Sequence, residues 1–220
     1  MRTIDVAPSI LSADFGHLIH EIETIEKAGA TYLHFDVMDG HFVPNISFGL
    51  PVLASIAHRH SLINDVHIMI SDPLTYGPQF VKAGADIVTF HYEALTTDEE
   101  RLAVIAAIRN AGGKVGMSIK PKTPVTVLPP FLDQLDLVLI MSVEPGFGGQ
   151  GFMQEALTRI AFLRKYIDKY ALATKIEVDG GINQETATLC KEVGVDILVA
   201  GSYLFGKEDI RARIAGLKRL

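Results

Sequence analysis

Short apolar runs alternate with amphipathic segments along the whole chain, and this alternation limits the possible folds more than any other feature. A run rich in Val, Ile, Leu and Phe predicts a buried strand, and a segment with helical periodicity follows each run. The predicted strands are Asp5–Leu11, Tyr32–Val37, Asp65–Ile70, Ile87–His91, Lys114–Ile119, Leu137–Met141, Lys175–Val178 and Ile197–Ala200. The predicted helices are Phe15–Ala28, Pro51–His58, Pro73–Ala83, Thr97–Ala111, Val125–Phe131, Met153–Tyr170, Gln184–Val193 and Asp209–Leu217. Strands that alternate with helices pair in parallel, so the chain predicts an α/β protein, a closed (β/α)8 TIM barrel, in one domain over residues 1–220.

Glycines follow four of the predicted helices, where the chain must turn back toward the next strand. They are Gly29, Gly84, Gly112 and Gly194. A glycine at this position supplies the left-handed residue that ends a helix, so the four glycines repeat one architectural unit. An open doubly wound sheet, whose parallel strands also alternate with helices, is the alternative fold.

The composition excludes several classes of function. Lys and Arg total 20 against 26 Asp and Glu, a net charge of −6, and no block of like charges offers a surface for nucleic acid. No run approaches the roughly 18 apolar residues that a membrane span requires. The single cysteine, Cys190, permits neither an internal disulfide nor a multi-thiolate zinc site. Because Met1 to Phe15 also lack the apolar core of a signal peptide, we expect a cytoplasmic protein with no membrane or nucleic-acid partner.

Polar side chains stand where the predicted strands end, and in a barrel this end carries the chemistry. Successive strand residues point to opposite faces, so His34, Asp36 and Met38 share one face, as do His67 and Met69. Asp179 ends the seventh strand. Two imidazoles and two carboxylates suit a divalent Zn, Fe, Co or Mn ion. The alternative is that each of the four is a hydrogen-bonded core residue.

Two more polar residues near these strand ends are expected to support the site. His91 ends the fourth strand, and we expect it beside the site or at its mouth rather than as a fifth ligand. Glu177 should face inward beside Asp179, where a buried carboxylate needs a partner, and we expect a structural salt bridge.

Glycine-rich segments follow the last three predicted strands. They are Gly146–Gly151, Gly180–Gly181 and Gly201–Ser202. Barrels commonly bind phosphate here through loop amides and a helix N-terminus, and glycines let the backbone approach a ligand closely. The three segments therefore predict a phosphate cradle that holds an anion by oriented N–H groups, without Lys or Arg.

Three methionines, Met38, Met69 and Met141, lie at the ends of their strands. A thioether there fills gaps in a core, or lines a pocket in which desolvation raises the pKa of a carboxyl group.

Several long motifs resemble the ribulose-phosphate 3-epimerase family, and the likeness covers nearly the whole chain. The matching stretches are Ala7–Asp14, His34–Asn45, Asp65–Met69, Met141–Gln150 and Glu177–Gly181. The resemblance implies a TIM barrel of the ribulose-phosphate-binding type. It also implies an isomerase of the pentose phosphate pathway that interconverts D-ribulose 5-phosphate and D-xylulose 5-phosphate by moving the proton at C3.

The resemblance also implies residue roles. The metal ligands, for one divalent ion per subunit, would be His34, Asp36, His67 and Asp179, and the catalytic acid/base pair would be Asp36 and Asp179. Substrate contacts would come from Ser9, His67, Gly146, Phe147, Gly148, Gly149, Asp179, Gly180, Gly181, Gly201 and Ser202. Met38, Met69 and Met141 would line the pocket. A homo-oligomer is implied as well, although no interface motif is visible.

The chemistry implied by the family agrees with these residue types. A proton next to a ketone is weakly acidic, so its removal requires a positioned base and stabilisation of the enediolate charge. Inversion at C3 requires a second, protonated carboxyl group on the opposite face of the substrate. Two aspartates on separate strands suit this task better than one base.

The fifth strand departs from the family pattern, because Lys120 stands where Asn is expected before Pro121. We interpret Lys120 as a subgroup variation, the alternative being a change in specificity. Three other functions remain open. They are a 3-epimerase of a six-carbon ketose phosphate such as D-allulose 6-phosphate, a metal-dependent phosphosugar aldolase on the same barrel, and a non-catalytic phosphosugar-binding barrel.

Overall fold

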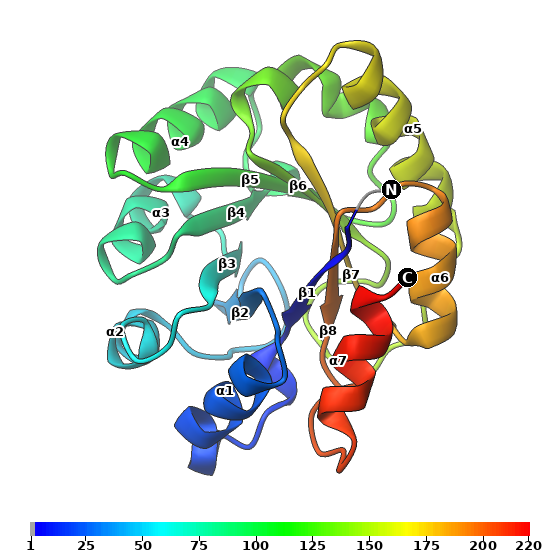
Figure 1. Cartoon of the computed structure of the whole chain (residues 1–220). Coiled ribbons are helices and arrows are strands. Elements are labelled where there is room, and N and C mark those ends of the chain that lie inside the picture. The colour runs from blue at the N-terminus through cyan, green and yellow to red at the C-terminus, as the bar shows by residue number, and fades with distance from the viewer. Residues whose placement is uncertain (1–2) are drawn as a thin grey trace.

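The computed structural model describes residues 3–220, so the first two residues of the predicted domain lie outside the described residues. Eight strands surround a central axis and the helices lie outside them (Figure 1). The strands are β1 (Asp5–Pro8), β2 (Tyr32–Met38), β3 (Ile63–Met69), β4 (Ile87–His91), β5 (Lys114–Ile119), β6 (Leu137–Met141), β7 (Lys175–Asp179) and β8 (Ile197–Ala200).

All pairs between these strands are parallel, and the first strand, β1, pairs with the last, β8. Between β1 and β2 the ring is completed by a parallel bridge from Ser9 to His34 and by the Thr31 N–H, which donates to the Val6 carbonyl at 3.2 Å. The sheet is therefore a nearly closed barrel, and the predicted TIM-barrel fold is confirmed. The doubly wound alternative is wrong. A doubly wound sheet reverses its strand order and keeps two edge strands, whereas here the strands pair in chain order and β1 pairs with β8.

The α-helices are α1 (Leu18–Lys27), α2 (Leu50–Ile56), α3 (Pro73–Lys82), α4 (Asp98–Asn110), α5 (Glu155–Lys169), α6 (Gln184–Glu192) and α7 (Ile210–Lys218). The four glycines predicted to end helices, Gly29, Gly84, Gly112 and Gly194, all have positive φ. The short 3₁₀ helices are Ile10–Ser12, Phe15–His17, Tyr92–Ala94, Val125–Val127 and Pro129–Gln134. Within residues 3–220, none of the helices has both the length and the apolar character needed to cross a membrane.

Three predicted elements differ from the structure. The α-helix expected over Val125–Phe131 is two 3₁₀ helices, since Pro129 and Pro130 lack the N–H groups that an α-helical ladder requires. The first strand ends at Pro8 rather than Leu11, because the Ser9 side chain accepts from the Leu11 N–H and begins a 3₁₀ turn. The third strand begins at Ile63, two residues before the predicted start at Asp65.

The alternation along each strand divides the buried side chains between two layers. On β2, Leu33, Phe35 and Val37 face outward and pack in the large core between the strands and the helices. The barrel interior holds a smaller apolar cluster that includes Leu139 and Val199. This division leaves the inward positions of β2, β3, β4 and β7 available for polar side chains.

Candidate active site

The register between β2 and β3 builds the site in layers. Parallel pairing sets His34 opposite Asp65, Asp36 opposite His67, and Met38 opposite Met69. All six side chains are buried, and they rise from the barrel interior toward the carboxyl ends of the strands. The polar residues thus form the two lower layers and the methionines form the layer nearest the mouth of the barrel.

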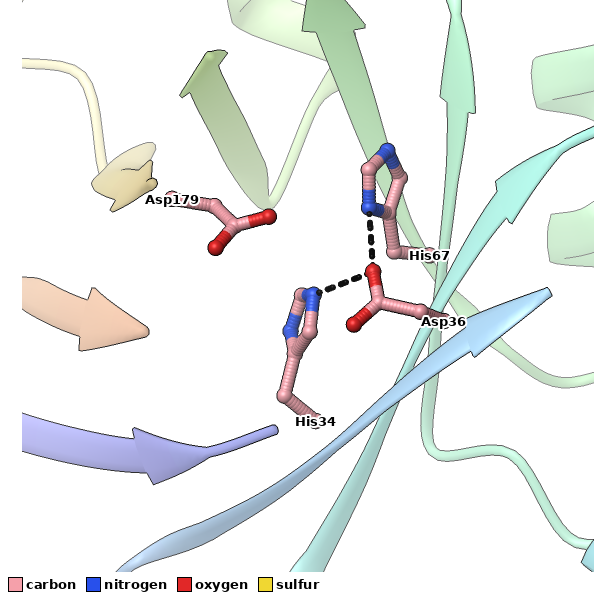
Figure 2. A group of neighbouring side chains, drawn as sticks. All are labelled: His34, Asp36, His67 and Asp179. Atoms are coloured by element: carbon pink, nitrogen blue, oxygen red, sulfur yellow. Dashed lines mark hydrogen bonds and ion pairs between the residues drawn. The ribbon is translucent and has the colours of Figure 1, made fainter. Parts of the chain in front are cut away.

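Asp36 stands at the centre of this arrangement (Figure 2). Its Oδ1 lies 3.0 Å from His67 Nδ1 and 3.3 Å from His34 Nε2, and its Oδ2 accepts a hydrogen bond from the Ser9 hydroxyl at 2.6 Å. Burial opposes ionisation of Asp36. The charge of His34 and the hydrogen bonds from His34 and His67 outweigh burial, so the pKa of Asp36 lies well below its ordinary value.

His34 is held from below by a second carboxylate. Its Nδ1 lies 2.6 Å from Asp65 Oδ2, and both side chains are fully buried. Burial favours the neutral imidazole, but the charges of Asp36 and Asp65 raise the pKa of His34 well above its ordinary value. The Nε2 atom points toward Asp36 Oδ1, 3.3 Å away, and has no other polar contact within the described residues.

Asp179 faces the other three residues from β7 (Figure 2). Burial and then the nearby charge of Asp36 raise its pKa to about 6. The two aspartates thus have opposite preferences in the protein without a metal, since Asp36 is held ionised and Asp179 retains its proton up to nearly neutral pH.

Glu177 lies below Asp179 on the same strand and is fully buried. The expected salt-bridge partner of Glu177 is a histidine. Within residues 3–220, its recorded ion-pair neighbour is His34 Nδ1, which lies 3.9 Å from Oε1. Burial and the charge of Asp65 raise the pKa of Glu177 well above its ordinary value, which favours the protonated form of the group.

His91 lies behind His67 rather than at the mouth of the site. Its Nε2 is 2.8 Å from His67 Nε2, and its Nδ1 is 3.3 Å from Glu93 Oε2. Burial lowers the pKa of His91 to about 4, so the ring is neutral. Although burial opposes it, hydrogen bonds from His91, Thr123 and the Lys120 N–H lower the pKa of Glu93 to about 2.

A pocket of about 390 Å³ opens above the cluster. The predicted residues that line it are Ser9, Asp36, Met38, Met69, Met141, Gly146, Phe147, Gly148, Gly149, Asp179, Gly180, Gly181, Gly201 and Ser202. His34 and His67 lie beneath its floor with no exposed surface. The predicted contact between His67 and the substrate therefore stays a prediction.

Glycine is required where the β7 loop passes the loop after β6. Gly181 has a φ of 62°, and a Cβ atom built there would lie 2.5 Å from the Phe152 nitrogen. The close packing of two backbones brings the Gly180–Gly181 segment to the pocket wall. Opposite it, the Asn45 side chain donates to the Gly146 carbonyl at 2.9 Å and connects the long loop after β6 to the end of β2.

Sequence reasoning missed several residues of the site. Lys207 and Arg213 line the pocket, whereas the sequence predicted an anion site built without Lys or Arg, and that expectation stays a prediction. They follow Ser202 by five and eleven positions, and only the turn after β8 and the start of α7 bring them back to the pocket. Asp65 was also missed, although it precedes His67 by two positions and the same alternation places it on the same face.

The four predicted ligands fit a divalent metal. One ligand atom from each of His34, Asp36, His67 and Asp179 lies within 4.8 Å of all the others. Nitrogen and carboxylate donors in this number suit Zn, Fe, Co or Mn. The Nε2 atom of His34, whose one polar contact within residues 3–220 is the 3.3 Å approach to Asp36, is the atom that such an ion would satisfy.

Fold and site together define a TIM-barrel protein with a His/Asp cluster and a glycine-rich pocket at the carboxyl ends of its strands. Among solved structures, the chain is similar to KGPDC from Streptococcus mutans, with a TM-score of 0.70, 13% identity, and coverage of 99% of this chain and 97% of that chain. It is also similar to 3-hexulose-6-phosphate synthase from Salmonella typhimurium, with a TM-score of 0.66, 18% identity, and coverage of 98% and 97%. These likenesses show the fold alone.

Sequence comparison identifies the family. Residues 5–205 match the model of the ribulose-phosphate 3 epimerase family. The ribulose-phosphate 3-epimerase of Mycobacterium bovis is 48% identical over 217 residues, which cover 97% of this chain and 91% of that protein. The Bacillus subtilis enzyme of the same name is 46% identical over 216 residues, or 98% of each chain. The chain belongs to the ribulose-phosphate 3-epimerase family and is an isomerase.

Proposed function

We propose that this protein interconverts D-ribulose 5-phosphate and D-xylulose 5-phosphate in a metal-dependent reaction at C3. Family membership supports the substrate class. The observation that carries the mechanism is the placement of Asp36 and Asp179, two carboxyl groups on separate strands, β2 and β7, that line one pocket. An epimerase needs both a base and an acid, one for each face of the substrate.

His34, Asp36, His67 and Asp179 would hold the ion, whose identity among Zn, Fe, Co and Mn the donor set leaves open. Bound there, the ion would supply Lewis-acid stabilisation of the negative charge that develops on the enediolate. The protein's own contribution is to keep the donors in place. Asp65 holds His34, and the Ser9 hydroxyl holds Asp36 Oδ2.

The two aspartates perform the proton transfers. In one direction, the ionised Asp36 takes the C3 proton and the protonated Asp179 returns a proton to the other face. In the reverse direction the roles exchange. Met38, Met69 and Met141 are at most 4% exposed and surround this chemistry with apolar surface, which excludes water from the enediolate.

The glycine-rich side of the pocket would bind the phosphate. The backbone N–H groups of Gly181, Gly201 and Ser202 donate to no acceptor within residues 3–220, so they are free for an anion. Lys207 adds positive charge to the pocket wall, while the charge of Arg213, which also lines it, is paired with Asp209 at 2.6 Å. Asn183 already caps the start of α6 by accepting from the Glu185 and Thr186 N–H groups, so loop amides rather than that helix end would bind the phosphate.

We further propose that the protein works in the cytoplasm as a homo-oligomer. An apolar hollow of about 570 Å³, lined by Ile46, Phe48 and Tyr76, supports an interface between copies. Ile46 is 76% exposed, and the exposed Phe15 ring lies 5.3 Å from Phe48. Sedimentation analysis would measure the oligomeric state.

The mechanism is tested by following proton exchange separately from epimerisation. Asp36→Asn and Asp179→Asn should each lose epimerisation by at least roughly 10²–10⁴-fold, because each removes one acid/base group. In deuterated water one variant should still exchange the C3 hydrogen of ribulose 5-phosphate, and the other that of xylulose 5-phosphate. NMR measures both exchanges.

Two controls are needed: one for loss of the metal, and one for the general effect of removing a carboxylate near the site. Each variant must first be shown to retain its metal, because both aspartates are proposed ligands. Asp39→Asn removes a carboxylate just beyond β2 that bonds Ser71 outside the pocket, and it should keep the wild-type exchange pattern. Interconversion at near wild-type rate by a metal-loaded Asp36 or Asp179 variant would exclude the two-carboxylate mechanism. A preference for D-allulose 6-phosphate would reassign the substrate.

A further inference from the structure

A continuous series of polar contacts runs from the cluster to the loop after β5. His67 Nδ1 lies 3.0 Å from Asp36 Oδ1, and His67 Nε2 lies 2.8 Å from His91 Nε2. His91 Nδ1 lies 3.3 Å from Glu93 Oε2. Glu93 Oε1 accepts from the Lys120 N–H at 2.7 Å and from the Thr123 hydroxyl. Both histidines have no exposed surface, so water cannot replace these contacts.

Two nitrogen atoms at 2.8 Å form a hydrogen bond only if one of them carries the hydrogen. Glu93 decides which one does. Its carboxylate is anchored by two donors and can only accept, so a neutral His91 must carry its hydrogen on Nδ1. The Nε2 atom of His91 is then a bare acceptor, and it must receive the hydrogen of His67 Nε2.

The position of the hydrogen on His91 determines which nitrogen of His67 can bind a metal ion. A neutral His67 with its hydrogen on Nε2 has a lone pair on Nδ1, the atom that faces Asp36 Oδ1. The opposite arrangement would place a hydrogen on His67 Nδ1, toward Asp36, and would set the lone pair of His91 Nδ1 against the Glu93 carboxylate. With both imidazoles neutral, a metal ion between His67 Nδ1 and Asp36 Oδ1 would satisfy every member of the series.

We propose that His91 and Glu93 are positioning residues that fix the tautomer of His67 and present its Nδ1 to the metal. This inference rests on the proposed metal dependence. The tautomer of the other histidine, His34, is the opposite one. Asp65 accepts the hydrogen on His34 Nδ1, which leaves Nε2 for the ion. The two imidazoles therefore offer different ring nitrogens, each selected by a carboxylate on its far side.

Packing holds the His91 ring in place between His67 and Glu93. The Phe42 ring centre lies 4.8 Å from that of His91, and Lys120 Nζ lies 3.8 Å from the Phe42 ring centre. Lys120 takes part in the series through its backbone N–H, which almost any residue could provide. This explains how the chain accommodates Lys120, where Asn was expected, without disturbing the series.

The first test measures the tautomers directly. In zinc-loaded wild-type protein labelled with ¹⁵N-histidine, long-range ¹⁵N–¹H NMR should show hydrogen on His67 Nε2 and on His91 Nδ1. Hydrogen on His67 Nδ1, or on His91 Nε2, would overturn the proposal.

The second test measures affinity of the metal-free protein for Co²⁺ and Zn²⁺ by competition with a chelator. His91→Leu removes the acceptor for His67 Nε2–H and should weaken binding roughly 10–100-fold, with a changed visible spectrum of the Co²⁺ form. His91→Gln retains an acceptor oxygen and should restore most of the affinity. Thr89→Val is the matched control, since Thr89 is buried two residues earlier on the same face of β4 and lies outside the series, and it should bind as wild type does.

Each outcome decides the question. Equal affinity in His91→Leu, His91→Gln and Thr89→Val would overturn the positioning role while leaving the metal site intact. If wild-type protein bound neither ion, the metal dependence itself would fail, a different result. Should His91→Leu not fold, Glu93→Gln tests the same series, because loss of the anchoring charge should weaken Co²⁺ binding and the wild-type tautomers remain measurable.

Discussion

The two sides of the pocket are built from different parts of the polypeptide. Around β2, β3 and β4 the working atoms belong to side chains, which are fully buried and contact one another at 2.6–3.3 Å. Around β6, β7 and β8, apart from the Asp179 side chain, the working atoms that we propose are backbone N–H groups in glycine-rich loops, and the wall there is partly exposed. Both sides stand at the carboxyl ends of strands, where the barrel places its loops.

The difference shows how each side achieves precision. The His/Asp side is fixed by further polar residues behind the first, such as Asp65 behind His34 and Glu93 behind His91. The glycine side is fixed by close approach of main chains, as where Gly181 meets Phe152. The first should therefore be sensitive to loss of a functional group, and the second to added volume.

The largest expected effect is on the His/Asp side. Removal of the metal by a chelator should reduce epimerase activity by at least ~10³-fold, since Lewis-acid stabilisation contributes several kcal/mol to the barrier. His34→Asn should do the same, because its amide can still donate to Asp65 but Nε2 is lost. His34→Ala is a poorer variant, as it leaves the buried Asp65 without a donor. Assays after stripping and re-adding the ion, with melting curves beside them, would measure this, and full activity in metal-free protein would contradict it.

A smaller effect is expected on the glycine side. A Cβ at Gly201 would lie 2.5 Å from the Ser12 hydroxyl oxygen, so Gly201→Ala pushes a side chain into the phosphate wall without a positive φ to strain. Displacing one hydrogen bond to the charged phosphate costs about 1.5–3 kcal/mol of binding, so KM for the phosphosugar should rise roughly 10–150-fold.

Gly49→Ala is the matched control for Gly201→Ala, because a Cβ at Gly49 meets no atom within 4 Å and Gly49 does not line the pocket. Steady-state kinetics on both variants would separate the two positions. An unchanged KM in Gly201→Ala would show that this wall does not bind the phosphate.

The smallest effect concerns stability of the metal-free protein against pH. The pKa of Asp179 is raised from 3.8 to about 6, so folding favours its protonated form. The stabilisation is present in full below pH 3.8 and is lost as the pH rises through 6. Asp179→Asn should therefore be more stable than wild type by about 1–3 kcal/mol at pH 7–8, and the difference should vanish near pH 4.

Denaturant unfolding at several pH values would measure this difference, and zinc supplies the control. Wild-type protein should gain more stability from the ion than Asp179→Asn, since the variant lacks one proposed ligand. A difference between the metal-free proteins that did not change with pH would mean that Asp179 is already ionised throughout this range.

The glycines after four of the helices and the apolar alternation were sufficient to predict the barrel, because both follow from local geometry. The same alternation predicted that His34 and Asp36 share one face, and applied once more it would have found Asp65. The failures occurred where local rules compete. At Val125–Phe131 the prolines prevented an α-helix, and at Ser9 a side-chain hydrogen bond ended the first strand.

The sequence by itself determined the barrel, the residue types at its strand ends and the glycines of its loops. Only the tertiary structure decided which polar groups meet, because strand register sets Asp36 beside His67, and barrel closure brings Asp179 and Arg213 to the same pocket. It also decided the protonation preferences of Asp36 and Asp179. Those depend on burial and on charges contributed by other strands, and no stretch of sequence around either aspartate contains that information.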